Sequence, residues 1–129
     1  MTAIRDHQRA ILAERHVRAV FEKRAEQAKA YGAVCMKLPI LVHQAGLAAA
    51  LHHVAQLSKT EKREILDHLA AQLREGGLLT DGTRDGLLRH TREASATQLL
   101  AATREAQRCL EWYRGFAKTI LKVEPGEDE

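Results

Sequence analysis

The sequence has 129 residues, of which 45% are apolar, 29% charged and 4% aromatic, a composition typical of one globular domain and too short for two. No run reaches the roughly 20 apolar residues of a membrane-spanning helix, and the charged start does not fit a signal peptide. Residues 1–123 carry 20 basic and 13 acidic side chains, a net charge of +7, because four acids lie in the last six residues. We therefore expect a cytoplasmic protein with an anionic partner, of which nucleic acid is the commonest kind.

The residue composition predicts an all-α fold. Alanine is the commonest residue, proline occurs twice, and Val, Ile and Thr form no alternating runs. The expected architecture is a compact single-domain bundle of about five to six helices over residues 1–123, with long N- and C-terminal helices. Residues 124–129 are expected to form an acidic, disordered tail.

The first predicted element is one long helix over residues 3–38. Apolar residues share one face of it at helical spacing, namely Ala10, Ala13, Val17, Val20, Phe21, Ala28, Tyr31, Cys35 and Leu38. The opposite face forms a basic stripe that is expected to face solvent, made of Arg5, Arg9, Arg15, Arg18, Lys23 and Lys29. Ile4 and Ile11 form a separate apolar patch to one side, which makes them candidates for a subunit interface.

A second helix is predicted over residues 39–57, and its apolar residues cover most of its circumference, as in a central helix. Pro39 marks either a break or the first turn of this helix. Ser58 and Glu61 match a capping box that begins a third helix. Gly76 and Gly77 end that helix, since glycine adopts the left-handed cap conformation without steric cost.

Residues 76–86 contain four of the eight glycines and predict a loop before a short fourth helix at Leu87. Ser95 and Gln98 resemble another cap, from which the last helix runs to about Lys122. One face of that helix is basic, with Arg104, Arg108, Arg114, Lys118 and Lys122. Like charges four residues apart on a helix repel, and a bound anion such as a phosphate backbone would reduce this repulsion. An ordinary face exposed to solvent explains the pattern equally well.

The sequence contains no catalytic, phosphate-binding or cofactor motif. The cysteines Cys35 and Cys109 lie on apolar helical faces and are expected to be free thiols. Among the histidines only His68 shares a helical face with a possible second ligand, Glu64, and two ligands do not form a metal site. Trp112 points sideways from the apolar face, where it can stack on a base or, as we favour, pack in the core or a subunit interface.

Two segments resemble a known family. Residues 31–54 (YGAVCMKLPILVHQAGLAAALHHV) contain a leucine-proline step followed by a Gly-Leu helix, and residues 103–118 (TREAQRCLEWYRGFAK) contain a T-x-E-A element followed by a tryptophan and a basic-aromatic-alanine run. Together they resemble the small subunit of the type III-B CRISPR effector, the Cmr complex. The sequence departs from the family pattern at Tyr113 and Gly115, where an aliphatic and a basic residue are usual.

The resemblance implies a non-catalytic subunit, without cofactor, metal or small-molecule substrate. Such a subunit stacks in several copies beside other Cmr subunits, along the path of a guide RNA and its target RNA. The candidate RNA-binding residues are Arg15, Arg18, Lys23, Arg104, Arg108, Arg114 and Lys118, and the candidate subunit interface is Ile4, Ile11 and Trp112. Two alternatives stay open: the small subunit of another CRISPR effector type, and a helix-turn-helix DNA-binding regulator, for which the turn after Gly76 is too long.

Overall fold

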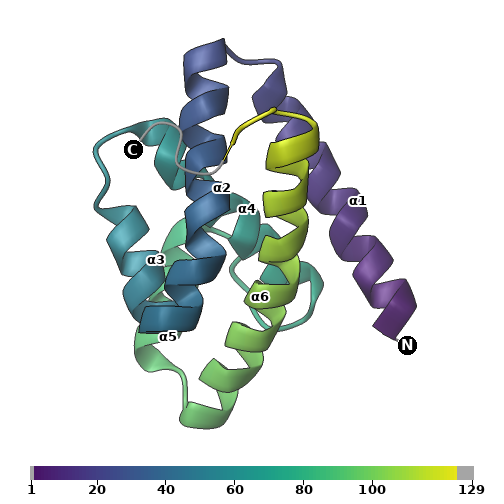
Figure 1. The fold of residues 1–129 in the computed structure, drawn as a ribbon. Coiled ribbons are helices and arrows are strands. Elements are labelled where there is room, and N and C mark those ends of the chain that lie inside the picture. The colour runs from purple at the N-terminus through teal and green to yellow at the C-terminus, as the bar shows by residue number, and fades with distance from the viewer. Residues whose placement is uncertain (1, 125–129) are drawn as a thin grey trace.

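Six helices make up the structure, a computed structural model that describes residues 2–124 (Figure 1). They are α1 (Thr2–Phe21), α2 (Ala25–Ala45), α3 (Leu47–Ala55), α4 (Thr60–Glu75), α5 (Arg84–Glu93) and α6 (Ala96–Thr119). The predicted all-α bundle with long terminal helices is confirmed. Of the predicted acidic tail, residues 125–129 lie outside the described residues.

The core lies where α1, α2 and α4 pack around α6. In Figure 1, α6 runs between α1 and α2, while α3 packs against α2 and α5 packs against α3 and α4. Tyr31 and Tyr113 are the largest fully buried side chains, and α4 adds Ile65, Leu66 and Leu69. Within residues 2–124 no helix has the length and apolar character needed to cross a membrane.

The prediction of one continuous helix over residues 3–38 is wrong, because the chain turns back between Phe21 and Ala25. Arg24 has an extended conformation (φ −60°, ψ 147°), and its carbonyl accepts the first backbone bonds of α2. None of the residues at this turn is a glycine or proline, so local propensity favours a continuous helix there. The reversal allows both α1 and α2 to pack against α6, and tertiary packing of this kind overrides local propensity.

Pro39 neither breaks a helix nor begins one, since it lies inside α2. The break instead comes at Gly46, whose φ of 91° and ψ of 160° are open to glycine but not to residues with a Cβ. The predicted second helix is therefore the last turns of α2 followed by α3. Val42, Leu51 and Val54 are buried as expected, whereas Ile40 is 48% exposed and Ala45 is exposed.

Of four predicted helix ends, two are confirmed, one is wrong and one is displaced. The capping box of Ser95 and Gln98 is present at the start of α6, and α4 ends at Gly76, with Gly77 at a φ of 80°. The box predicted at Ser58 is absent, because the N-cap of α4 is Lys59, with no side-chain hydrogen bond. The last helix ends at Thr119, slightly before the predicted end.

Candidate nucleic-acid interface

A basic groove of about 590 Å³ runs between the C-terminal half of α2 and the middle of α6. Helical spacing of three or four residues brings its α6 residues onto one face, toward α2. We call it the α2–α6 groove, and it is lined by Pro39, Ile40, His43, Gln44, Arg104, Gln107, Arg108, Glu111 and Arg114.

Three arginines dominate the charge of the α2–α6 groove, and Glu111 is the one acid among its lining residues. Arg104 and Arg108 are exposed, while Arg114 is half-buried and its Nε has no hydrogen-bond partner among the described residues. A buried N–H without a hydrogen-bond partner raises the free energy of the folded chain. A phosphate oxygen that accepts a hydrogen bond from this N–H would remove that cost. The structure therefore brings three of the seven predicted RNA-binding residues into one site.

The other four predicted RNA-binding residues lie outside the α2–α6 groove. Lys118 is exposed on α6, one turn beyond Arg114. Arg15 and Arg18 are exposed on α1, and Arg18 Nη2 pairs with Glu14 Oε2 at 3.1 Å. Lys23 follows α1, and its Nζ lies 2.8 Å from Glu64 Oε1. These residues do not form one continuous basic stripe with the groove.

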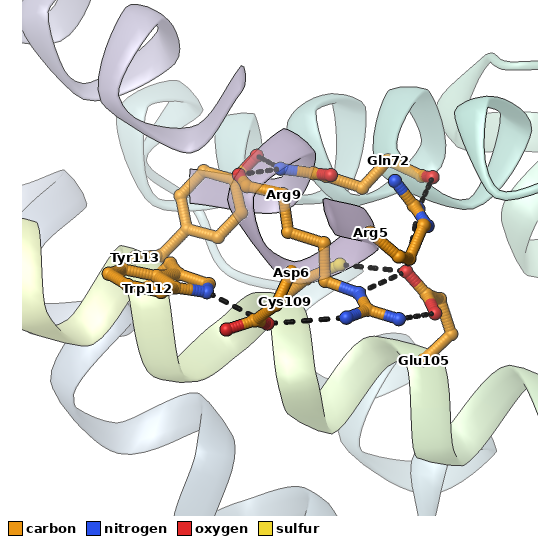
Figure 2. Close-up of polar contacts among 8 residues, drawn as sticks. All are labelled: Arg5, Asp6, Arg9, Gln72, Glu105, Cys109, Trp112 and Tyr113. Carbon is orange, nitrogen blue, oxygen red and sulfur yellow. Dashed lines mark hydrogen bonds and ion pairs between the residues drawn. The ribbon is translucent and has the colours of Figure 1, made fainter. Parts of the chain in front are cut away.

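On another face of α6, Glu105 anchors α1 through two arginines (Figure 2). Arg9 Nε and Nη2 each donate to one oxygen of the Glu105 carboxylate at 2.7 Å, and Arg5 Nη2 donates to Oε2 at 2.7 Å. Arg9 is only 4% exposed and Arg5 is half-buried. The expectation of a solvated stripe is therefore wrong for these two arginines, because both are used to hold α1 against α6.

The carboxylate of Glu105 is charged despite its burial. Burial alone would raise its pKa, but the hydrogen bond from Arg9 and the positive charges of Arg5 and Arg9 hold the pKa below its usual value. The same hydrogen bond raises the pKa of Arg9. The attraction between buried charges offsets the cost of removing them from water when several hydrogen bonds also join them, as they do here.

Trp112 and Gln72 add further hydrogen bonds around the cluster of Glu105, Arg5 and Arg9. Trp112 Nε1 donates to Asp6 Oδ1 at 3.1 Å, and its ring stacks on Phe116 with centroids 5.8 Å apart. Gln72 Nε2 of α4 donates to the Arg9 carbonyl oxygen at 3.0 Å and to the Tyr113 hydroxyl at 3.2 Å. Trp112 is thus half-buried between α6 and α1, whereas Ile4 and Ile11 are 55% and 46% exposed on α1.

Sequence reasoning missed Glu105, although a signal was present. Glu105 lies next to Ala106 and one turn from Ala102 and Cys109, all of which are fully buried. An acid placed among apolar residues on the core side of a helix requires a cation as its partner. That signal would have predicted a buried cation beside Glu105, but not which basic residue supplies it.

Comparison with known proteins places the chain in a family. Residues 5–120 match the model of the family described as CRISPR-associated protein (Cas_Cmr5). The chain is 35% identical over 109 residues to the CRISPR system Cmr subunit Cmr5 of Thermus thermophilus, a match that covers 79% of this chain and 89% of that relative. Its fold is similar to the X-ray crystal structure of a CRISPR-associated Cmr5 family protein from the same organism, with a TM-score of 0.80 and 30% identity over 90% of this chain and 96% of the other.

Fold and sequence together define a small, all-helical CRISPR-associated protein of the Cmr type. The chain belongs to the Cmr5 family. The predicted resemblance to the small subunit of the type III-B effector is therefore confirmed. The matched region includes the α2–α6 groove and Glu105 with both of its arginines.

Proposed function

We propose that this chain is a non-catalytic structural subunit of a type III-B CRISPR ribonucleoprotein, the Cmr complex, and contacts RNA backbone through the α2–α6 groove. Family membership supports the assembly, because the relative from Thermus thermophilus is named as a Cmr subunit. The observation that carries the RNA contact is the convergence of Arg104, Arg108 and Arg114 on one groove. Arginines in such a row bind phosphates without reading the base sequence.

Contact between copies of the chain is part of the same proposal. Ile4 and Ile11 lie one above the other on α1, seven residues apart, and both are about half exposed. Exposed apolar residues on one stripe of a helix favour packing against another protein surface. Trp112 is less available for contact with a neighbouring copy, since its N–H already donates a hydrogen bond to Asp6 within the chain.

The helix-turn-helix alternative has less support. Its two helices would be α4 and α5, which are joined by the eight residues 76–83, whereas the motif has a turn of three or four residues. Our proposal therefore concerns RNA backbone and not duplex DNA.

The test of the RNA contact is a double substitution, Arg104→Ala with Arg108→Ala, in the purified full chain. Both residues are exposed, so the fold is expected to remain intact. We expect affinity for a fluorescent RNA duplex to fall about tenfold at moderate salt. The slope of log affinity against log salt should also decrease by about 0.9 for each phosphate contact removed. Fluorescence anisotropy across a salt series measures both quantities.

The matched control is Arg89→Ala with Arg92→Ala, which removes two exposed arginines of α5, away from the α2–α6 groove. Its affinity and salt slope should equal those of the unchanged chain. Equal binding by the groove variant and the unchanged chain would overturn the assignment of the groove to RNA.

A further inference from the structure

A second basic pocket, of about 330 Å³, lies at the turn between α1 and α2, beside the chain that follows α6. In Figure 1 this yellow segment leads from the end of α6 toward α2. A volume near 300 Å³ is at the lower end of pockets that hold small ligands. We call it the Phe21 pocket, and it is lined by Phe21, Lys23, Ala25, Ala28, Lys29, Leu121, Lys122 and Val123.

Phe21 differs from its predicted place in the core. The sequence pattern put it on the buried face of a continuous helix, but the turn after α1 leaves it 56% exposed at the edge of the pocket. It is the most exposed of the large apolar residues in the described part of the chain. An exposed aromatic ring beside cations is the arrangement on which unpaired bases stack in proteins that bind single-stranded nucleic acid.

Three lysines line the same pocket as this ring, and within residues 2–124 no acid lines the pocket. Lys23 pairs with Glu64, which lies outside the lining, so part of its charge is already balanced. Lys29 and Lys122 enter from α2 and from the chain after α6. An apolar floor with lysines at its rim suits a ligand that combines a planar apolar group with a negative charge.

The backbone holds Lys122 at this rim in an unusual conformation. Its φ of 61° makes it the one non-glycine residue with a positive φ in the described chain. Beyond it, the Val123 N–H bonds the Ala117 carbonyl oxygen at 3.1 Å, and the Val123 side chain is 3% exposed and packs on Gly32. Glycine is the usual residue where a chain leaves a helix with positive φ. A lysine in its place is the kind of backbone outlier that clusters at functional sites.

We propose that the Phe21 pocket binds one unstacked nucleotide of single-stranded RNA, with the base on the Phe21 ring and the phosphate among Lys23, Lys29 and Lys122. This inference rests on the proposed function, since it takes RNA to be the partner. The site is separate from the α2–α6 groove, because Lys29 and the groove residues of α2 lie 10 to 15 positions apart, about 15 to 22 Å along the helix. RNA is favoured over an acidic peptide because a nucleotide accounts for both features of the pocket: its base stacks on the Phe21 ring and its phosphate binds the lysines. The carboxylates of an acidic peptide would bind the lysines only.

The experiment uses the full chain with a single-stranded RNA that contains 5-iodouridine, irradiated and analysed for the cross-linked residue. We expect the cross-link at Phe21. We also expect Phe21→Leu, which keeps an apolar side chain, to weaken binding of this RNA about tenfold and to leave duplex binding unchanged. The matched control is Leu100→Ala, an exposed apolar residue on another helix, which should bind like the unchanged chain.

A second variant, Lys122→Gly, separates binding from folding. Glycine adopts a positive φ more readily than lysine, so the variant should fold at least as well while losing one phosphate contact. Its salt slope for single-stranded RNA should fall by about 0.7. Cross-links elsewhere, or single-stranded binding unchanged by both variants, would overturn the Phe21 pocket. Loss of duplex binding in the groove variant would still support the proposed function in that case, so the two failures are distinguishable.

Discussion

Glu105 accepts three short hydrogen bonds from Arg5 and Arg9, and these bonds cross from α6 to a helix almost 100 residues earlier in the chain. All three groups are removed wholly or partly from water. Replacing the whole cluster with apolar residues could leave stability unchanged. Removing the acid alone leaves the buried Arg9 with only Asp6, whose Oδ1 lies 3.2 Å from Arg9 Nη1, as an acidic partner, and that is the costly change.

We therefore expect Glu105→Gln to lower the free energy of unfolding by about 3 kcal/mol. The side chain keeps its size, so the loss reports the charge and its hydrogen bonds and not a cavity. Urea denaturation followed by circular dichroism measures the change. Glu111→Gln, an exposed acid on the same helix, is the control and should stay within about 0.5 kcal/mol of the unchanged chain. Equal losses in the two variants would contradict the structural role of Glu105.

Individual site residues could be predicted from the sequence only where exposure follows from position on a helix. Arg104 and Arg108 lie opposite an apolar face and are exposed, as expected. Arg9 lies on a face that is polar by pattern, yet its long side chain reaches Glu105 and is buried. Helical periodicity gives the direction of a side chain but not the partner that it meets across the bundle, so Arg9 could not be placed from one helix alone.

Among the helices, α2 and α6 each contain one interior glycine, and the two have opposite surroundings. A Cβ on Gly115 of α6 would meet nothing within 4 Å. A Cβ on Gly32 of α2 would lie 2.5 Å from Val123 Cγ2 and 3.4 Å from Leu121 Cδ1. Gly32 therefore allows the chain after α6 to approach α2, while Gly115 has no such packing role.

Alanine at these two positions should act in opposite directions. Gly115→Ala is expected to stabilise the chain by about 0.5 to 1 kcal/mol, because alanine has the higher helix propensity and there is space for its methyl group. Gly32→Ala should destabilise it by about 1 to 3 kcal/mol, because Val123 must move. Thermal unfolding of both variants measures the difference. A lower melting temperature for Gly115→Ala than for Gly32→Ala would contradict this account.

The helices themselves were predictable where a local signal marks their ends. Ser95 with Gln98, and Gly76 with Gly77, carry such signals, and both ends are confirmed. The turn at residues 22–24 carries none, since good helix formers continue through it. It exists because two helices pack on α6 and not because of its own residues. Pro39 shows the reverse case, a strong local signal that packing overrides.

At the centre of the molecule, His16 and His68 join α1 to α4 by stacking their rings, with centroids 4.1 Å apart and planes within 7°. Each ring has a tyrosine hydroxyl on its Nδ1: Tyr113 at 2.7 Å from His16 and Tyr31 at 2.6 Å from His68. Burial and the nearness of the His68 ring together lower the pKa of His16 to about 3, and burial lowers the pKa of His68 to about 4. Both histidines are therefore neutral in the folded chain.

This pair should make stability depend on pH below neutrality. An unfolded histidine has a pKa near 6.5, so between pH 6.5 and about 4 the unfolded chain binds more protons and the free energy of unfolding rises with pH. Stability is complete above pH 6.5 and is lost on acidification. From pH 7 to pH 5 we expect a loss of about 3 kcal/mol for the two histidines, less than full burial would give because His16 is partly open to solvent.

Urea denaturation at pH 7 and pH 5 measures this loss, above the range in which most carboxylates titrate. His68→Gln should remove about half of the difference between the two pH values. His53→Gln, a change at an exposed histidine of α3, is the control and should keep the full difference. Equal stability of the unchanged chain at the two pH values would contradict the neutral, buried pair.

The two cysteines are fully buried, and burial raises the pKa of both thiols. A thiol that is neither accessible nor ionised reacts slowly with oxidants and alkylating reagents. Toward such reagents the folded chain behaves as though it had no cysteine. One cysteine introduced on the surface therefore becomes a unique chemical handle, and a dye or spin label can be placed beside either proposed RNA site without first removing the native thiols.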